Sequence, residues 1–155
     1  MSEYHATVSW QRGEEEKFTD EKYSRMHSWT FEGGIMIPAS PSHHIVPLPY
    51  SNPNYVDPEQ AYVASLSSCH MLSFLHVAAQ AGFCVDEYED NAVGYLERVS
   101  RGKMAMTKVV LRPKCTYSGA KKPTPDDLED LHHQAHEVCF IANSVKTEIV
   151  TEIIS

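Results

Sequence analysis

Within residues 5–33, two bursts of alternating hydrophobic and polar residues flank a charged tip at 12–16. A period of two is typical of half-buried strands, so we predict two antiparallel strands here. Residues 38–58 then hold five prolines before Pro58. This density of proline in an otherwise apolar stretch predicts a long ordered loop.

The segment after these prolines gives the clearest helix in the sequence. Asp57 suits the N-cap, Pro58 suits the first helical position, and Gly82 provides the stop. Between them the residues are apolar or small on every side, which is typical of a buried helix. Small residues at helical spacing, which permit close approach of a second helix, are Ala61, Ala64, Ser65 and Ser68.

Residues 83–118 have the composition and alternation of strands. Two runs, 92–98 and 104–111, are separated by the polar, glycine-containing stretch 100–103. This pattern predicts a β-hairpin.

A second helix is indicated by Thr124 as N-cap and Pro125 at the first helical position, and it is expected to end near Cys139. The alternating tail 145–154 predicts an edge strand. The resulting order of elements predicts one α+β domain over residues 1–155, with mostly antiparallel pairing.

The charge of the chain limits its partners. Thirteen Lys and Arg against 21 Asp and Glu give a net charge of -8, which argues against nucleic acid because phosphate binding needs a cationic surface. No run of 18 apolar residues exists, so we expect no membrane span. The first residues lack the features of a signal peptide, and four cysteines are too few for a disulfide scaffold. We therefore expect a reduced chain in the cytoplasm.

Two cysteines occupy positions where chemistry is conceivable. Cys69 lies in the middle of the first helix, where a small hydrophobic filler is the simpler interpretation. A reactive thiolate there needs a nearby cation, because the helix dipole acts only within the first turn. Cys139 is expected at the edge of an apolar arc of the second helix, half buried. The two cysteines are 70 positions apart but lie on different predicted helices of one small domain, so the two thiols could meet at disulfide distance.

Histidines on the second helix raise a competing hypothesis. His132, His136 and Cys139 share a helical face at i, i+4 and i+7, a spacing that can hold zinc, with His133 and the Cys69-His70 pair as further ligand candidates. No CxxC pair supports this site, and exposed histidines on an amphipathic helix are more common.

Two arginines are candidates for the cation. Arg25 shares the predicted strand face of Tyr23 and Trp29, which is unusual for an unpaired charge, and Arg12 follows the first predicted strand. A solvated surface charge is the simpler interpretation of either residue.

Two sequence stretches resemble the OsmC/organic hydroperoxide resistance family. In the first, residues 56–61 place a Pro-Glu pair at the start of the long helix, and Ser67-Ser68-Cys69-His70 follows. In the second, residues 136–144 place Cys139 just before an Ile-Ala-Asn-Ser sequence. The resemblance implies antiparallel sheets wrapped around long central helices in an intertwined homodimer, which agrees with the apolar first helix.

The resemblance also implies a thiol peroxidase for organic hydroperoxides that needs no metal or other cofactor. Cys69 matches the peroxidatic position and Cys139 the resolving position. Glu59 matches the glutamate that orients the catalytic arginine through a salt bridge, and that arginine is either Arg12 or Arg25. The resemblance suggests a dithiol of lipoyl type as the reductant. The alternatives are a zinc-binding protein and a non-catalytic, stress-associated protein of the same fold.

Overall fold

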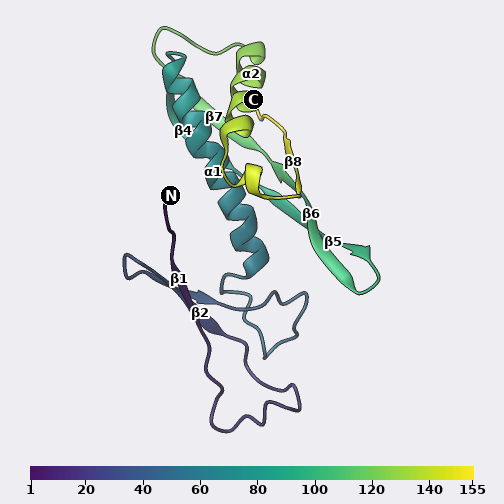
Figure 1. Ribbon diagram of the computed structural model, residues 1–155. Helices are drawn as coiled ribbons and strands as arrows, with labels where there is room; N and C mark the ends of the chain where they lie inside the picture. The colour runs from purple at the N-terminus through teal and green to yellow at the C-terminus, as the bar shows by residue number, and fades with distance from the viewer. The chain divides into compact units, whose positions relative to one another are not determined.

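The chain forms two compact units, residues 1–61 and 62–155, in a computed structural model that describes all of residues 1–155. The helix α1 (Pro58–Gln80) begins in the first unit and continues through the second (Figure 1). No helix in the chain has both the length and the hydrophobicity that a membrane span requires.

The first unit contains an antiparallel sheet in the order β1-β2-β3. The two predicted strands are confirmed as β1 (Ala6–Ser9) and β2 (His27–Phe31). The strand β3 (Met36–Ala39) was not predicted, because Pro38 places it inside the expected loop. Its position at the end of the sheet order explains why proline is tolerated there.

The segment before β2 differs from the prediction. The second strand was expected from Tyr23 but starts at His27. The chain there folds into a loop in which the rings of Trp10, Phe18 and Tyr23 lie within 5.8 Å of one another, centroid to centroid. Phe18 has a positive φ of 69°, a conformation incompatible with a strand.

The predicted boundaries of α1 are confirmed. Asp57 accepts a hydrogen bond from the backbone N–H of Gln60 at 2.8 Å, and the Gln60 side chain accepts one from the N–H of Asp57 at 3.1 Å, so the helix begins with a capping box. At the other end Gly82 has φ +85°, the left-handed conformation that commonly follows a helix.

Two sheets complete the second unit. One pairs β4 (Cys84–Asp90) with β7 (Pro113–Ser118) in antiparallel orientation. The other has the order β5-β6-β8, in which β5 (Val93–Ser100) and β6 (Lys103–Leu111) form the predicted hairpin. The tail supplies β8 (Glu148–Thr151), which is an edge strand as predicted and pairs in parallel with β6.

The second helix, α2 (Pro125–Val138), begins as the sequence indicates. Thr124 is its N-cap and forms a capping box with Asp127. The helix ends at Val138, so Cys139 is its C-cap and has an extended backbone conformation, with φ -69° and ψ 113°.

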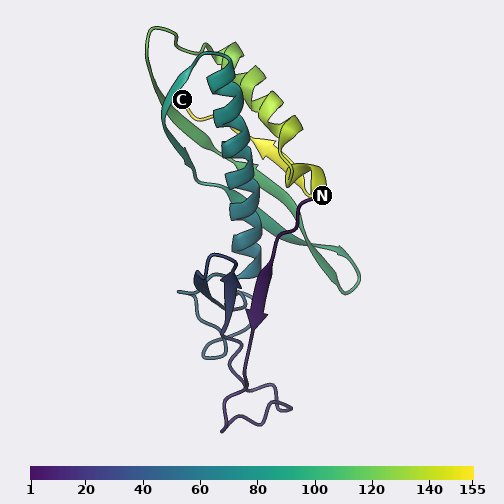
Figure 2. The same cartoon turned by 60° about the vertical axis from the view of Figure 1, so that its left-hand side comes forward.

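Both helices pack on the β4–β7 sheet, and Figures 1 and 2 both show α2 alongside the C-terminal half of α1. The main core of the second unit consists of Phe74, Val77, Ala78, Phe83, Leu131 and Ala135. A smaller cluster, of Leu66, Val109 and Leu111, joins α1 to β6. One side of α1 stays uncovered in the single chain, where Leu72 is 61% exposed. The expectation of a helix buried on every side is therefore not met by one chain alone, because the sheets and α2 cover only part of its circumference.

Candidate active site

The structure brings Cys69 and Cys139 together. Cys69 lies near the middle of α1 and is half-buried, whereas Cys139 caps α2 and is 1% exposed. The two side chains are close enough to share a hydrogen bond. Residues 70 positions apart in the sequence thus form one two-thiol site in the second unit.

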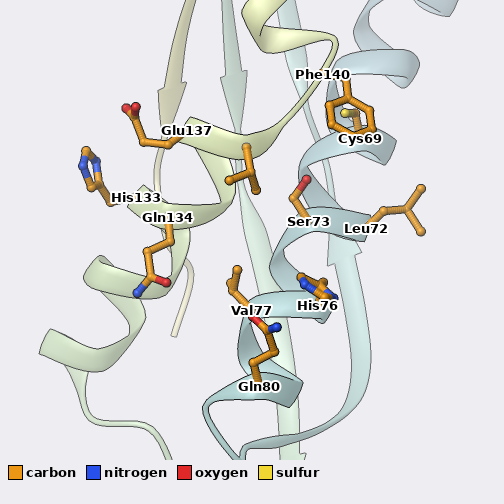
Figure 3. Close-up of a pocket in the computed structure, with 11 residues that line it drawn as sticks. Cys69, Leu72, Ser73, His76, Val77, Gln80, His133, Gln134, Glu137 and Phe140 are labelled. Carbon is orange, nitrogen blue, oxygen red and sulfur yellow. The ribbon is translucent and has the colours of Figure 1, made fainter. Parts of the chain in front are cut away.

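A groove of about 700 Å³ between α1 and α2 opens on Cys69. Figure 3 shows α1 side chains on one wall and α2 side chains on the other. The groove is lined by Cys69, Leu72, Ser73, His76, Val77, Gln80, His133, Gln134, Glu137, Val138 and Phe140. Cys139 is absent from this lining, so a small molecule in the groove meets the Cys69 sulfur first.

The environment of Cys139 keeps its thiol protonated. Burial, followed by the hydrogen bond with Cys69, raises the pKa of Cys139 to about 11. The backbone N–H of Ala142 opposes this effect by donating to the sulfur at 3.4 Å. At neutral pH Cys139 is therefore a thiol with a hydrogen-bond donor already in place for a developing negative charge.

The Ile-Ala-Asn-Ser sequence has a structural role around Cys139. Asn143 donates its backbone N–H to the Cys139 carbonyl at 3.0 Å and its side-chain amide to the Glu137 carbonyl at 3.2 Å. The Ser144 hydroxyl donates to the carbonyl of Phe140 at 2.7 Å. These bonds satisfy carbonyl groups at the end of α2 and fold the chain back over Cys139.

The expectation that Cys139 is half-buried at the edge of an apolar arc is wrong. Val138, the last residue of that helix, is 48% exposed. The helical periodicity used for the prediction stops at Val138, and the chain turns there and carries Cys139 into the interior.

The zinc alternative finds no support in the geometry. His132 is buried and makes a hydrogen bond with His70, Nδ1 to Nε2, at 2.9 Å. No group of three or more His, Cys, Asp or Glu side chains is arranged to hold a metal ion. The predicted face of His132, His136 and Cys139 is divided because Cys139 lies beyond the helix end.

The two candidate arginines lie in the first unit. Arg25 stacks its guanidinium over the Tyr23 ring at 3.8 Å and donates to the carbonyls of Glu21 and Tyr23. Arg12 is exposed and donates to the carbonyls of Gly13 and Glu16.

Glu59 lies in the first turn of α1 and forms no ion pair with either arginine. It precedes Cys69 by ten residues of one uninterrupted helix, a rise of about 15 Å. The roles of Glu59, Arg12 and Arg25 remain predictions.

The groove itself provides no permanent cation. Its lining contains no lysine or arginine, and Glu137 is its one carboxylate. A permanent positive charge beside Cys69 must therefore come from outside this lining.

Sequence reasoning missed the pairing of His70 with His132 and the place of Phe140 beside Cys69 in the groove. The sequence indicated only a metal-ligand role for His70 and His132. The residue type alone does not show that a histidine has a buried partner. Phe140 is 81% exposed, and nothing in the sequence pointed to it except that it follows Cys139.

Comparison with known proteins assigns the chain to a family. The sequence profile described as OsmC-like protein matches residues 51–154. The chain therefore belongs to the OsmC-like family. Searching the curated proteins gave no match.

Solved structures agree with this assignment. An OsmC-like protein of unknown function from Vibrio cholerae is 58% identical, with a TM-score of 0.96 over 99% of this chain and 100% of that one. An organic hydroperoxide resistance protein from Elizabethkingia anophelis is 18% identical, with a TM-score of 0.71 over 99% and 94%. The organic hydroperoxide resistance protein OhrB of Bacillus subtilis is also 18% identical, with a TM-score of 0.66 over 97% and 98%. The last two share the fold with this chain.

Proposed function

We propose that this protein is a thiol-dependent peroxidase that reduces organic hydroperoxides in the cytoplasm. The observation that carries the proposal is the contact between an accessible thiol, Cys69, and a buried thiol, Cys139, at the end of a groove. The names of the Elizabethkingia anophelis and Bacillus subtilis proteins support the choice of substrate class.

The first step is an attack by the Cys69 thiolate on one oxygen of the hydroperoxide. The O–O bond breaks, the alcohol leaves after taking up a proton, and Cys69 becomes a sulfenic acid. The groove is large enough for a medium-sized organic molecule, and Leu72, Val77, Val138 and Phe140 give it apolar walls. This lining favours an alkyl or acyl hydroperoxide over hydrogen peroxide.

In the second step Cys139 attacks the sulfenic sulfur of Cys69. A disulfide forms, and the hydroxyl of the sulfenic acid leaves as water with the proton of the Cys139 thiol. An external dithiol, for which a lipoyl group is our candidate, then reduces the disulfide by exchange. No metal or other cofactor takes part in these steps.

The cation in this proposal is Arg12 or Arg25, oriented by Glu59. A guanidinium beside Cys69 would favour the thiolate and donate hydrogen bonds to the peroxide oxygens. We also propose a homodimer, because a second copy would cover the exposed side of α1 around Leu72.

The test is consumption of cumene hydroperoxide with dihydrolipoamide as reductant. We expect the wild type to turn over, Cys69→Ser to lose activity at least 100-fold, and Cys139→Ser to lose sustained turnover after a first oxidation, since the sulfenic acid then lacks its resolving thiol. Cys84→Ser is the matched control, because Cys84 is an exposed thiol outside the site. Undiminished activity in Cys69→Ser would end the proposal.

A further inference from the structure

His70 and His132 form a buried pair that the proposed chemistry does not use. Their side chains are 1% and 4% exposed, and His70 Nε2 lies 2.9 Å from His132 Nδ1 with the rings within 4° of parallel. Apart from the contact between the two thiols, this is the one hydrogen bond between side chains that links α1 to α2.

The pair is uncharged at neutral pH. Burial is the main cause that lowers the pKa of both imidazoles to about 4. The charge of His136 lowers the pKa of His70 further, and the charge of His70 lowers that of His132. A single proton therefore lies between Nε2 of His70 and Nδ1 of His132.

The arrangement has a cost that apolar residues would avoid. His70 Nδ1 is fully buried and has no hydrogen-bond partner. Two well-packed apolar side chains would fill the space without an unpaired polar atom. Apolar side chains would not fix the position of one helix relative to the other, because apolar contacts tolerate sliding. A hydrogen bond sets a distance and an angle.

The bond joins α1, which carries Cys69, to α2, whose C-cap is Cys139. His70 follows Cys69 directly on α1, and His132 precedes Cys139 by seven residues. The His132 ring also stacks on Phe74, one turn along α1 from His70, with 4.2 Å between ring centroids. Both α1 contacts of His132 therefore lie within about one and a half turns of Cys69.

We propose that His70 and His132 are positioning residues that fix the register of α2 on α1 and thereby hold Cys139 within bonding distance of Cys69. The inference rests on the proposed pairing of the two thiols. A slip of either helix by a fraction of a turn would move Cys139 away from Cys69 while leaving the apolar core largely covered.

The test is the thiol–disulfide equilibrium of the purified protein in buffers of reduced and oxidised dithiothreitol. The protein dithiol transfers two electrons and two protons to oxidised dithiothreitol and becomes the Cys69–Cys139 disulfide. The constant of this exchange measures how well the two thiols are placed. The measurement requires no peroxide.

Three substitutions separate positioning from packing. His132→Phe keeps a ring to stack on Phe74 but removes the hydrogen bond, and we expect the exchange constant to fall about tenfold. His132→Asn keeps a polar atom near the Nδ1 position, and we expect a constant within about threefold of the wild type. The control Glu129→Phe adds the same ring at an exposed position of α2 outside the groove and should leave the constant unchanged.

A folded His132→Phe variant with the wild-type constant would overturn the proposal. If that variant does not fold, His132→Gln takes its place, because glutamine displaces the polar group by one methylene. A loss in His132→Gln but not in His132→Asn supports positioning, and equal constants overturn it. A wild-type disulfide without peroxide turnover would refute the proposed function alone, and failure of the wild type to form the disulfide would refute both.

Discussion

The backbone N–H of Ala142 points at the sulfur of Cys139 from 3.4 Å, inside a turn that hides this sulfur from solvent. The buried thiol is therefore protonated at rest yet prepared to carry negative charge for a moment. Cys69 lies beside it on the groove. The different surroundings of the two sulfurs give them different reactivities.

The first prediction concerns alkylation of the reduced native protein at pH 7. Because Cys139 is 1% exposed and its pKa is raised to about 11, iodoacetamide should modify it at least 10-fold more slowly than Cys69. Peptide mass spectrometry over time measures both rates, with exposed Cys84 as internal reference. Equal rates for Cys69 and Cys139 would contradict the described burial.

The second prediction concerns acid stability. The pKa of His70 and of His132 is about 4 in the folded chain against 6.5 ordinarily, so the unfolded chain binds more protons between these values. The free energy of unfolding should have its full value above pH 6.5 and decrease towards pH 4. The decrease should be up to about 1.4 kcal/mol per pH unit for each histidine. Asp90, whose charge favours the protonated form of His70, reduces the effect.

Urea unfolding between pH 7 and pH 4.5 measures this dependence. The double variant His70→Gln/His132→Asn keeps polar groups at the paired positions but cannot titrate. It should therefore show a flatter profile. An equally steep profile in the double variant would assign the acid sensitivity to other groups.

The third prediction concerns Asp90 at the end of β4. Its carboxylate accepts from the Ser67 hydroxyl at 2.5 Å and from the backbone N–H of Arg112 at 2.6 Å, so it ties α1 to the strands. Asp90→Ala leaves both donors without this acceptor and should destabilise the chain by about 1–3 kcal/mol. Urea midpoints measure the loss. Glu129→Gln, at an exposed position of α2, should change stability by less than about 0.5 kcal/mol.

The fourth prediction concerns Gly94 in β5. A Cβ atom there would lie 2.5 Å from Cγ2 of Val63 and 2.6 Å from Cε of Met106, so Gly94→Ala forces α1 and β6 side chains to move. We expect a loss of about 1–3 kcal/mol in thermal or urea unfolding. Gly33→Ala, where a Cβ meets nothing within 4 Å, is the matched control. Equal stability of the two variants would refute this close contact.

The parts of the fold that local chemistry dictates could be read from the sequence. Asp57, Thr124 and Gly82 mark helix ends through hydrogen bonds and backbone conformations that are properties of those residues. The hairpin of β5 and β6 likewise follows from alternation and a turn. The strand β3 was missed because Pro38 is a poor strand former, and only the neighbouring β2 makes its pairing possible.

The two thiols of the candidate site could be named from the sequence, but their environment could not be predicted. Cys69 and Cys139 were named from the sequence, yet the depth of Cys139 depends on a turn beyond α2 whose direction no periodicity reveals. The pairing of His70 with His132 spans 62 residues. Such a contact is set by how α1 and α2 pack, which a pattern along one helix does not contain.

The unequal depth of the two sulfurs also gives the proposed reductive half of the cycle a direction. A thiol arriving from solvent along the groove would meet the sulfur of Cys69, so the mixed disulfide would form there and Cys139 would depart. The backbone N–H of Ala142 would donate a hydrogen bond to the sulfur that leaves. The entrance used by the oxidant would then also be the entrance used by the reductant, and the two would have to take turns.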